Sequence, residues 1–123
     1  MKIIVIGAGL IGGVIARDLV ALQEYQISVA DIDHQKLAIL SKDLNVNTVP
    51  ANLSDIKVIN KIIANQDIVI CAVPGFLGFN IFKTAIESGK NIVDISSMSE
   101  SQMELDDLAK KNEVTAVVEM GVA

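Results

Sequence analysis

The sequence has few of the side chains on which metal sites and redox centres depend. Its 123 residues include one cysteine, Cys71, and one histidine, His34, which lie far apart in the chain. A metal site needs several such ligands close together, so we expect no bound metal. A single cysteine cannot form an internal disulfide, which is typical of proteins from a reducing cytoplasm.

Long hydrophobic runs and basic clusters are also missing. Residues 3–16 are nearly all apolar, but the run contains four glycines and is shorter than the roughly 20 residues that span a membrane. No signal-peptide cleavage pattern follows it. The net charge is −5, the ten basic residues are scattered, and aromatic residues make up 3% of the chain. We therefore expect neither a membrane nor a nucleic acid as a partner.

Valine and isoleucine runs alternate with helical patterns along the whole chain, and 51% of its residues are hydrophobic. This alternation predicts an α/β fold in which helices cover both faces of a parallel sheet. We expect one domain over residues 1–123, a doubly wound sheet of the Rossmann type with strand order 3-2-1-4-5-6. The six expected strands cover about residues 3–6, 26–31, 45–49, 67–72, 91–95 and 114–120. The expected helices cover about 11–22, 33–44 (capped by Asp33), 54–63 (capped by Ser54), 77–88 and a last segment from Ser99 or Ser101.

Three glycines at the end of the first expected strand predict a phosphate-binding turn. Gly7 allows a sharp turn, Gly9 leaves space for a pyrophosphate, and Gly12 allows the next helix to pack closely on the sheet. The backbone amides of Leu10 and Ile11 would face the phosphates at the positive end of that helix.

The second expected strand ends in a carboxylate, Asp31. At this position an acid accepts hydrogen bonds from the adenosine ribose hydroxyls. Ile32 and Asp33 follow, so no arginine is ready to receive the 2′-phosphate of NADP. The pattern favours NAD over NADP as the cofactor.

Parallel strands place their carboxyl ends at one edge of the sheet, where the ligand of such a fold lies. Small residues after the fourth strand would leave room for the nicotinamide ribose, and Asn52 and Leu53 could border the adenine. The predicted cofactor-binding residues are Gly7, Gly9, Leu10, Ile11, Gly12, Asp31, Ile32, Asp33, Asn52, Leu53, Ala72, Val73 and Pro74.

Several other segments have two interpretations. Residues 73–79 fit a turn that leads into a helix, or a loop with Gly75 and Gly78 as flexible points that closes over the cofactor or docks another domain. Asp94, Ser96 and Ser97 fit a simple strand end, or a contact with cofactor or substrate. His34 is expected at the surface. Cys71 is expected to pack inside a central strand rather than act as a nucleophile.

The motifs GAGLIGGVIARDL, VADID, AVPGFLGF, VDISSM, ELDDLAKK and VTAVVEMGVA together resemble the amino-terminal domain of the saccharopine dehydrogenase family. Within it they look closest to the lysine 6-dehydrogenase-like branch, and the similarity covers essentially the whole chain. The resemblance implies an NAD(P)-dependent oxidoreductase that acts on the carbon–nitrogen bond of an amino acid or its imine adduct. It also implies a substrate-binding, dimerising domain beyond Gly121, and hence a possible homodimer. Families of this kind usually have aspartate where Glu119 or Asn52 stands.

The resemblance assigns cofactor roles to Gly7, Gly9, Leu10, Ile11, Asp31, Ile32, Ala72, Val73 and Pro74. It assigns no catalytic residue, because substrate recognition belongs largely to the further domain. The expected function is therefore that of a cofactor-binding domain that is not catalytic alone.

A regulatory nucleotide-sensing module is the alternative. The domains that gate potassium uptake resemble this chain through the glycine turn and Asp31. They typically follow the fourth strand with a polar, acid-rich segment, whereas this chain has Pro74-Gly75-Phe76-Leu77. We therefore rank the sensor below the oxidoreductase.

Overall fold

The chain forms a six-stranded parallel sheet with the order β3-β2-β1-β4-β5-β6, as the sequence predicts. The computed structural model describes residues 1–73, 75–95, 112 and 116–118. The strands are β1 (Lys2–Ile6), β2 (Gln26–Asp31), β3 (Asn47–Pro50), β4 (Ile68–Cys71), β5 (Asn91–Asp94) and β6 (Ala116–Val118). The helices are α1 (Leu10–Ala21), α2 (His34–Asp43), α3 (Ile56–Ile63) and α4 (Gly75–Glu87). The helix predicted from Ser99 or Ser101 lies outside the described residues.

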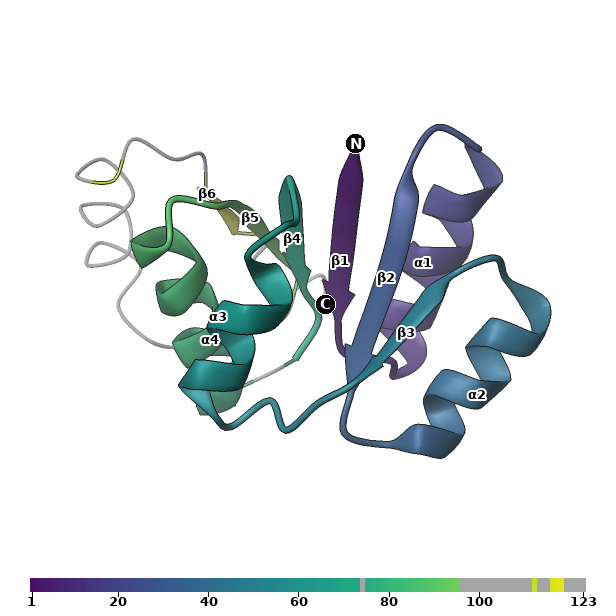
Figure 1. Cartoon of the computed structure of the whole chain (residues 1–123), viewed down its shortest axis with the longest axis horizontal. Helices are drawn as coiled ribbons and strands as arrows, with labels where there is room; N and C mark the ends of the chain where they lie inside the picture. The colour runs from purple at the N-terminus through teal and green to yellow at the C-terminus, as the bar shows by residue number, and fades with distance from the viewer. Residues whose placement is uncertain (74, 96–111, 113–115, 119–123) are drawn as a thin grey trace.

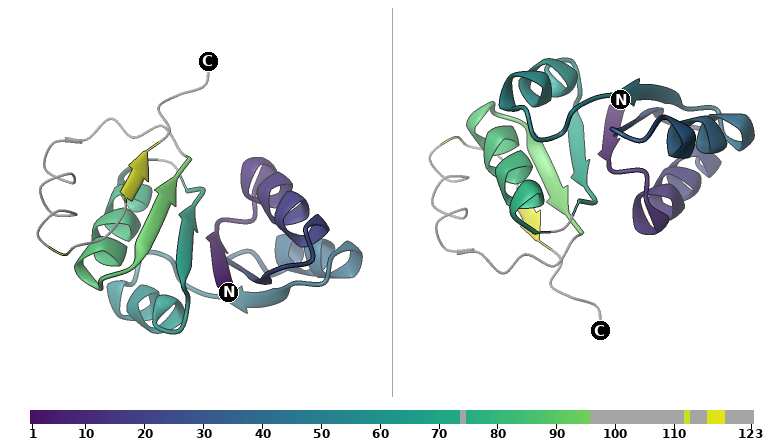
Figure 2. Two further views of the ribbon diagram at one scale, coloured as in Figure 1. Left: turned by 90° about the horizontal axis from the view of Figure 1, so that it is seen from above. Right: turned by 90° about the horizontal axis from the view of Figure 1, so that it is seen from below.

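The helices cover the two faces of the sheet in pairs (Figures 1 and 2). Helices α1 and α2 lie on one face, and α3 and α4 lie on the other. Alternate residues of β1 face the two sides: Ile3 and Val5 belong to the core with α1 and α2, whereas Ile4 and Ile6 belong to the core with α3 and α4. This arrangement explains why β1 is apolar at every one of these positions, since both of its faces are buried.

The strand order reverses between β1 and β4. The chain builds β1, β2 and β3 in one direction, crosses back over residues 51–55, and then builds β4, β5 and β6 on the other side of β1. All the paired strands are parallel, so their carboxyl ends lie along one edge of the sheet. The loops after β1 and β4 separate at this reversal, and a crevice forms there.

Two expected element boundaries differ from the structure near β3. The strand includes Pro50, which was expected to end it; β3 lies at the edge of the sheet, where a residue without an N–H group is tolerated. Asp55, not Ser54, caps α3, because its carboxylate accepts a hydrogen bond from the Lys57 amide at 3.0 Å. The Ser54 hydroxyl instead donates to Asn52 Oδ1 at 2.6 Å.

The predicted cap of α2 is confirmed. Asp33 Oδ1 accepts hydrogen bonds from the backbone amides of Gln35 and Lys36, at 2.9 and 3.2 Å. The helix therefore starts directly after the end of β2. It brings the first-turn side chains of α2 close to Asp31.

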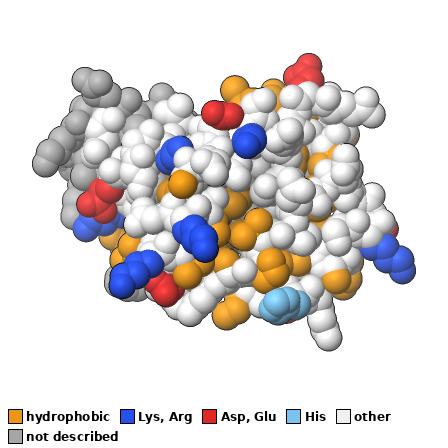
Figure 3. Space-filling model, viewed as in Figure 1, with side chains coloured by type: hydrophobic (Ala, Val, Ile, Leu, Met, Phe, Trp, Pro, Cys, Tyr) orange, Lys and Arg blue, Asp and Glu red, His pale blue; other side chains and the backbone are white. Residues whose placement is uncertain are grey.

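Surface charge is mixed on the face that Figure 3 shows. Lysine, arginine and acidic side chains are interspersed there, and hydrophobic side chains gather in the middle and lower part of the view. Among the described residues, no helix combines the length and apolar character needed to span a bilayer. Within the same residues, no three histidine, cysteine or acidic side chains gather as a metal site would require.

Candidate functional site

A pocket of about 380 Å³ lies at the point where the strand order reverses. It is built by the glycine turn after β1, the end of β2 with the start of α2, the loop after β3, and the end of β4 with the start of α4. Its lining residues are Gly7, Gly9, Asp31, Ile32, Lys36, Asn52, Leu53, Ser54, Ala72, Val73 and Leu77. Residues that are far apart in sequence thus meet at the edge that the sequence predicts.

Gly7 makes the turn out of β1 possible. Its φ angle is +110°, a conformation that residues with side chains rarely adopt. A Cβ atom there would lie 3.1 Å from the Ala72 carbonyl oxygen and 3.1 Å from Val73 Cγ2. Gly7 therefore allows both the turn and the close approach of the loop after β4.

Gly9 and Gly12 differ in what surrounds them. A Cβ atom at Gly12 would overlap the carbonyl oxygen of Gly7, so this glycine lets α1 pack directly on the turn. At Gly9 no atom of the described residues beyond its chain neighbours lies within 4 Å of the Cβ position, and the backbone φ is −73°. Neither packing nor the backbone angle requires glycine at position 9, which leaves open space beside the pocket.

The start of α1 offers hydrogen-bond donors. Gly9 is its N-cap residue, and no side chain caps the helix there. The first amides of a helix have no acceptor within the helix and lie at the positive end of its dipole. Open space at Gly9 beside these donors fits a pyrophosphate.

Asp31 is half-buried and holds two loops in place. Its Oδ2 accepts a hydrogen bond from the Ala8 amide at 2.7 Å, and its Oδ1 accepts one from the Asp33 amide at 2.8 Å. The carboxylate therefore links the glycine turn to the start of α2. Each oxygen keeps a further lone pair, so Asp31 can still accept a hydrogen bond from a ligand hydroxyl.

Some predicted site residues do not line the pocket. The side chains of Leu10 and Ile11 are 88% and 58% exposed and do not line the pocket. These two residues would therefore bind phosphate only through their backbone amides. Gly12 lies behind the turn, and the Asp33 carboxylate caps α2. Pro74 lies outside the described residues.

Sequence reasoning missed three lining residues, Lys36, Ser54 and Leu77. Lys36 lies in the first turn of α2, and its place could have been found from the Asp33 cap, which sets the start of that helix. Ser54 was assigned to a helix cap. The position of Leu77 follows from α4, which starts at Gly75 and not at residue 77.

Residues 75–79 belong to α4, with Gly78 buried. This supports the interpretation of residues 73–79 as a turn that leads into a helix, rather than as a closing loop. The Gly78 carbonyl oxygen lies 3.8 Å from Cys71 Sγ, close enough for a weak hydrogen bond from the thiol.

Cys71 and Asp94 are buried next to one another in register on β4 and β5. Burial raises the pKa of the Cys71 thiol to about 12, and the nearby charge of Asp94 adds to the rise. The thiol is therefore protonated at neutral pH, as expected for a packing residue. The burial of Asp94 supports its interpretation as a strand end; Ser96 and Ser97 lie outside the described residues, and His34 is exposed.

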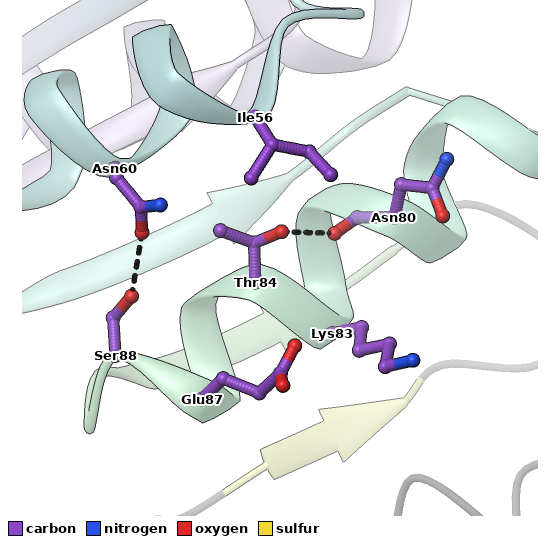
Figure 4. Close-up of a pocket in the computed structure, with 7 residues that line it drawn as sticks. All are labelled: Ile56, Asn60, Asn80, Lys83, Thr84, Glu87 and Ser88. Carbon is purple, nitrogen blue, oxygen red and sulfur yellow. Dashed lines mark hydrogen bonds between the residues drawn. The ribbon is translucent and has the colours of Figure 1, made fainter.

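A second pocket, of about 390 Å³, lies between α3 and α4 (Figure 4). Two hydrogen bonds join four of its lining residues: Ser88 Oγ donates to Asn60 Oδ1 at 2.8 Å, and Thr84 Oγ1 donates to the Asn80 carbonyl at 2.7 Å. All of its lining residues belong to the two helices or their ends. This second pocket does not lie at the edge of the sheet that holds the carboxyl ends of the strands. The first pocket is therefore the candidate site.

Comparison with known families finds one matching family model. The model is described as the saccharopine dehydrogenase NADP binding domain, and it matches residues 3–117. Among the curated relatives are two that match nearly the whole chain. The NADP(+)-dependent, L-glutamate-forming saccharopine dehydrogenase of Saccharomyces cerevisiae is 23% identical over 98% of this chain, which corresponds to 27% of the relative. The mitochondrial alpha-aminoadipic semialdehyde synthase of Mus musculus is 25% identical over 98% of this chain, which corresponds to 13% of the relative.

Solved structures share the fold at low sequence identity. Apo saccharopine dehydrogenase (L-Glu forming) from Saccharomyces cerevisiae has a TM-score of 0.87 at 23% identity, over 98% of this chain and 27% of its own. GenD2 from gentamicin A biosynthesis, in complex with NAD, has a TM-score of 0.80 at 20% identity, over 96% and 34%. The TrkA-N domain of the inner membrane protein ybaL from Escherichia coli has a TM-score of 0.72 at 14% identity, over 98% and 87%.

Proposed function

The chain belongs to the saccharopine dehydrogenase NADP binding domain family, and from this premise we propose that it is the cofactor-binding part of an oxidoreductase acting on the carbon–nitrogen bond of an amino acid or its imine adduct. One observation carries the proposal: the open space at Gly9 lies beside the uncapped start of α1, in the same pocket as Asp31. A bound nicotinamide would supply the hydride chemistry.

The chain's own residues would bind and orient the dinucleotide. The amides at the start of α1 would hold the pyrophosphate, and Asp31 would accept a hydrogen bond from the adenosine ribose. Ala72 and Val73, at the end of β4, would border the nicotinamide ribose. The proposed set is the one that the sequence predicts, with Lys36, Ser54 and Leu77 added from the pocket.

We propose NAD as the preferred cofactor. Asp31 lies where the adenosine ribose would bind, and its charge would repel a 2′-phosphate. Relatives are described with either cofactor: the yeast saccharopine dehydrogenase is named with NADP(+), and the GenD2 structure holds NAD. The preference therefore rests on Asp31 and not on these relatives.

Substrate recognition is assigned in this proposal to a further domain. The chain spans 27% of the yeast relative and 13% of the mouse relative. Such enzymes usually place the substrate between the nucleotide fold and another domain. We assign the residues that recognise substrate, and any homodimer contact, to that domain.

Nucleotide sensing is the second candidate, because the glycine turn and Asp31 also resemble the domains that gate potassium uptake. This chain covers 87% of the TrkA-N domain, a larger share than of the yeast enzyme. Its identity of 14% supports a shared fold and no more. The family model matches residues 3–117 and favours the oxidoreductase.

Titration of NADH into this chain tests the proposal, with binding followed by calorimetry. Gly9→Val would fill the space meant for the pyrophosphate, so we expect affinity to fall by about 2 kcal/mol, or roughly thirtyfold. The open surroundings of Gly9 allow the variant to keep the wild-type urea midpoint. Gly13→Ala is the control, because its Cβ would make only an ordinary contact, 3.5 Å from Leu40 Cδ2.

No NADH binding by the wild type would overturn the proposal. If Gly9→Val lowers the urea midpoint, then Gly9→Ala, with a smaller side chain, repeats the test. If a folded Gly9 variant binds NADH with wild-type affinity, the pyrophosphate does not bind at this turn.

A further inference from the structure

We propose that the pocket between α3 and α4 binds an α-amino acid as its zwitterion, with Lys83 holding the carboxylate and Glu87 the ammonium group. The side chain of the ligand would be apolar and would lie against Ile56. Among the described residues, none lines both this pocket and the nucleotide pocket. The inference therefore goes beyond the proposed function and does not depend on it.

The pocket lies where one polar stripe of α4 faces the amino-terminal half of α3 (Figure 4). Residues three or four positions apart are neighbours on the surface of a helix. Five lining residues follow this spacing on α4 and at its end, and two come from α3: Asn80, Lys83, Thr84, Glu87 and Ser88, with Ile56 and Asn60. The volume of about 390 Å³ falls in the range of about 300–1,000 Å³ that is typical of small-molecule sites.

Two opposite charges line this pocket without neutralising each other. Within the part of the chain that the structure describes, no hydrogen bond or ion pair of the Lys83 or Glu87 side chain is found. Lysine followed by glutamate four residues later is the weaker order for an ion pair on a helix. Lys90 provides the contrast, because its Nζ donates to two backbone carbonyl oxygens at 2.7 and 3.1 Å. The pocket thus offers one cation and one anion to a ligand.

Donors and acceptors are separated along the pocket. Asn80 and Lys83 lie nearer the start of α4, whereas Glu87 and Ser88 lie at its end (Figure 4). Residues one helical turn apart have Cβ atoms about 5–6 Å from each other. An α-amino acid carries its carboxylate and its ammonium group on one carbon, so a single molecule can reach both charges. A ligand with charge of one sign only would meet one like charge in the same pocket.

Thr84 adds a fixed polar group between the two charges. Its side chain is only 7% exposed, and its Oγ1 donates to the Asn80 carbonyl oxygen at 2.7 Å. The hydroxyl has then used its proton and keeps its lone pairs, so it can only accept a further hydrogen bond. An ammonium group held by Glu87 would find a second acceptor in this hydroxyl.

Ile56 gives the pocket an apolar wall. It is the first residue of α3 and its side chain is 54% exposed. A ligand side chain that covers apolar surface gains from removing it from water. An amino acid with an apolar side chain should therefore bind more tightly than glycine.

The test uses L-leucine as the probe, followed by two-dimensional NMR titration of the wild-type chain. We expect the amide signals of α3 and α4 to move and those of Gly7 and Gly9 to stay. Isocaproic acid is leucine without the ammonium group, and isoamylamine is leucine without the carboxylate. Each should bind about tenfold more weakly than L-leucine, as for loss of one partly exposed charge contact. Glycine should also bind more weakly than L-leucine.

Paired variants assign each charge. Lys83→Gln and Glu87→Gln should each weaken L-leucine about tenfold. Lys83→Gln should leave the binding of isoamylamine unchanged, because this analogue has no carboxylate to lose. Glu87→Gln should likewise leave isocaproic acid unchanged. Lys61→Gln and Glu24→Gln are the matched controls, since both residues lie outside the pocket lining, and they should keep wild-type affinity. If a variant lowers the urea midpoint, the analogues on the wild type decide the question.

The inference fails if L-leucine does not bind, if either analogue binds as tightly as L-leucine, or if the signals that move belong to the glycine turn. It also fails if Lys61→Gln weakens L-leucine as much as Lys83→Gln does. The proposed function stands in each of these results, because NADH binding to the wild type tests it separately. Failure of NADH to bind would overturn the proposed function and leave the L-leucine result intact.

Discussion

Asp31 holds two loops together in the structure, in addition to its proposed role in binding the ribose. Its two oxygens receive the amides of Ala8 and Asp33, so one side chain holds the glycine turn against the start of α2. Both amides would lose a charged acceptor if the carboxylate were removed. If Asp31 also binds the ribose as proposed, ligand affinity and fold stability depend on the same group.

Asp31→Ala is expected to show both effects. NADH affinity should fall by about 1–3 kcal/mol through loss of a charged hydrogen bond to the ribose. The free energy of unfolding should also fall by about 1–3 kcal/mol, because two amides lose their acceptor. Calorimetry and urea denaturation measure the two quantities. Unchanged affinity in a destabilised variant would mean that Asp31 is only a structural link and that the ribose bonds elsewhere.

At the scale of single residues, the structure places Gly7, Gly9 and Asp31 of the predicted set along the pocket, while their role in cofactor binding stays a prediction. Two of the glycines are constrained by backbone geometry: Gly7 by its φ of +110° and Gly12 by the overlap that a Cβ would make with Gly7. Lys36 was missed because the spacing rule was applied only to the residues directly after the strand. A side chain one helical turn further on reaches the same edge, and the predicted Asp33 cap already placed Lys36 in that turn.

At the scale of elements, the close approach of α1 to the turn after β1 defines the site. Gly12 and Gly13 are neighbours in α1 but have different surroundings. A Cβ at Gly12 would overlap the Gly7 carbonyl oxygen, whereas one at Gly13 would lie 3.5 Å from Leu40 Cδ2. The fold thus requires glycine at one of the two positions only.

Gly12→Ala should destabilise the fold by about 3 kcal/mol, because α1 must move away from the turn. Gly13→Ala should stabilise it by about 0.5–1 kcal/mol, since alanine loses less backbone entropy on folding. Urea denaturation of the pair checks both signs. Equal effects of the two substitutions would contradict the close contact between α1 and Gly7.

Element types followed from the sequence more readily than element ends did. The runs of β1 and β4 are apolar because they are buried, and this marks them as strands. The cap of α3 is Asp55 and not Ser54, since either side chain can cap a helix and only the turn at Asn52 decides between them. Gly75, with a φ of +72°, begins α4 in the segment 73–79, for which the sequence also allowed a closing loop.

At the scale of the whole molecule, the order β3-β2-β1-β4-β5-β6 was predictable because six alternating strands with a glycine turn after the first match a dinucleotide-binding sheet. The pocket is harder to predict, because four separate loops contribute to it. The strand ends that these loops follow could be predicted from the sequence. The side chains that meet there, such as Ser54 and Leu77, depend on how each loop folds.

Ligand binding to the folded chain alone should stabilise the whole molecule. At about one hundred times Kd, NADH should raise the free energy of unfolding by about 2.7 kcal/mol. Chemical denaturation with and without NADH measures this shift. Gly9→Val should lose most of it at the same NADH concentration. A shift of equal size in that variant would show that NADH stabilises the fold from another place.

The reversal between β1 and β4 also has a mechanical consequence. Strands β1, β2 and β3 build one side of the sheet and β4, β5 and β6 the other, and the chain crosses between them over residues 51–55. Gly9 and Lys36 on one side and Ala72 and Leu77 on the other line the same pocket. A molecule held there ties the two sides together across their seam, and a force that pulls them apart must break its contacts as well as the ladder between β1 and β4.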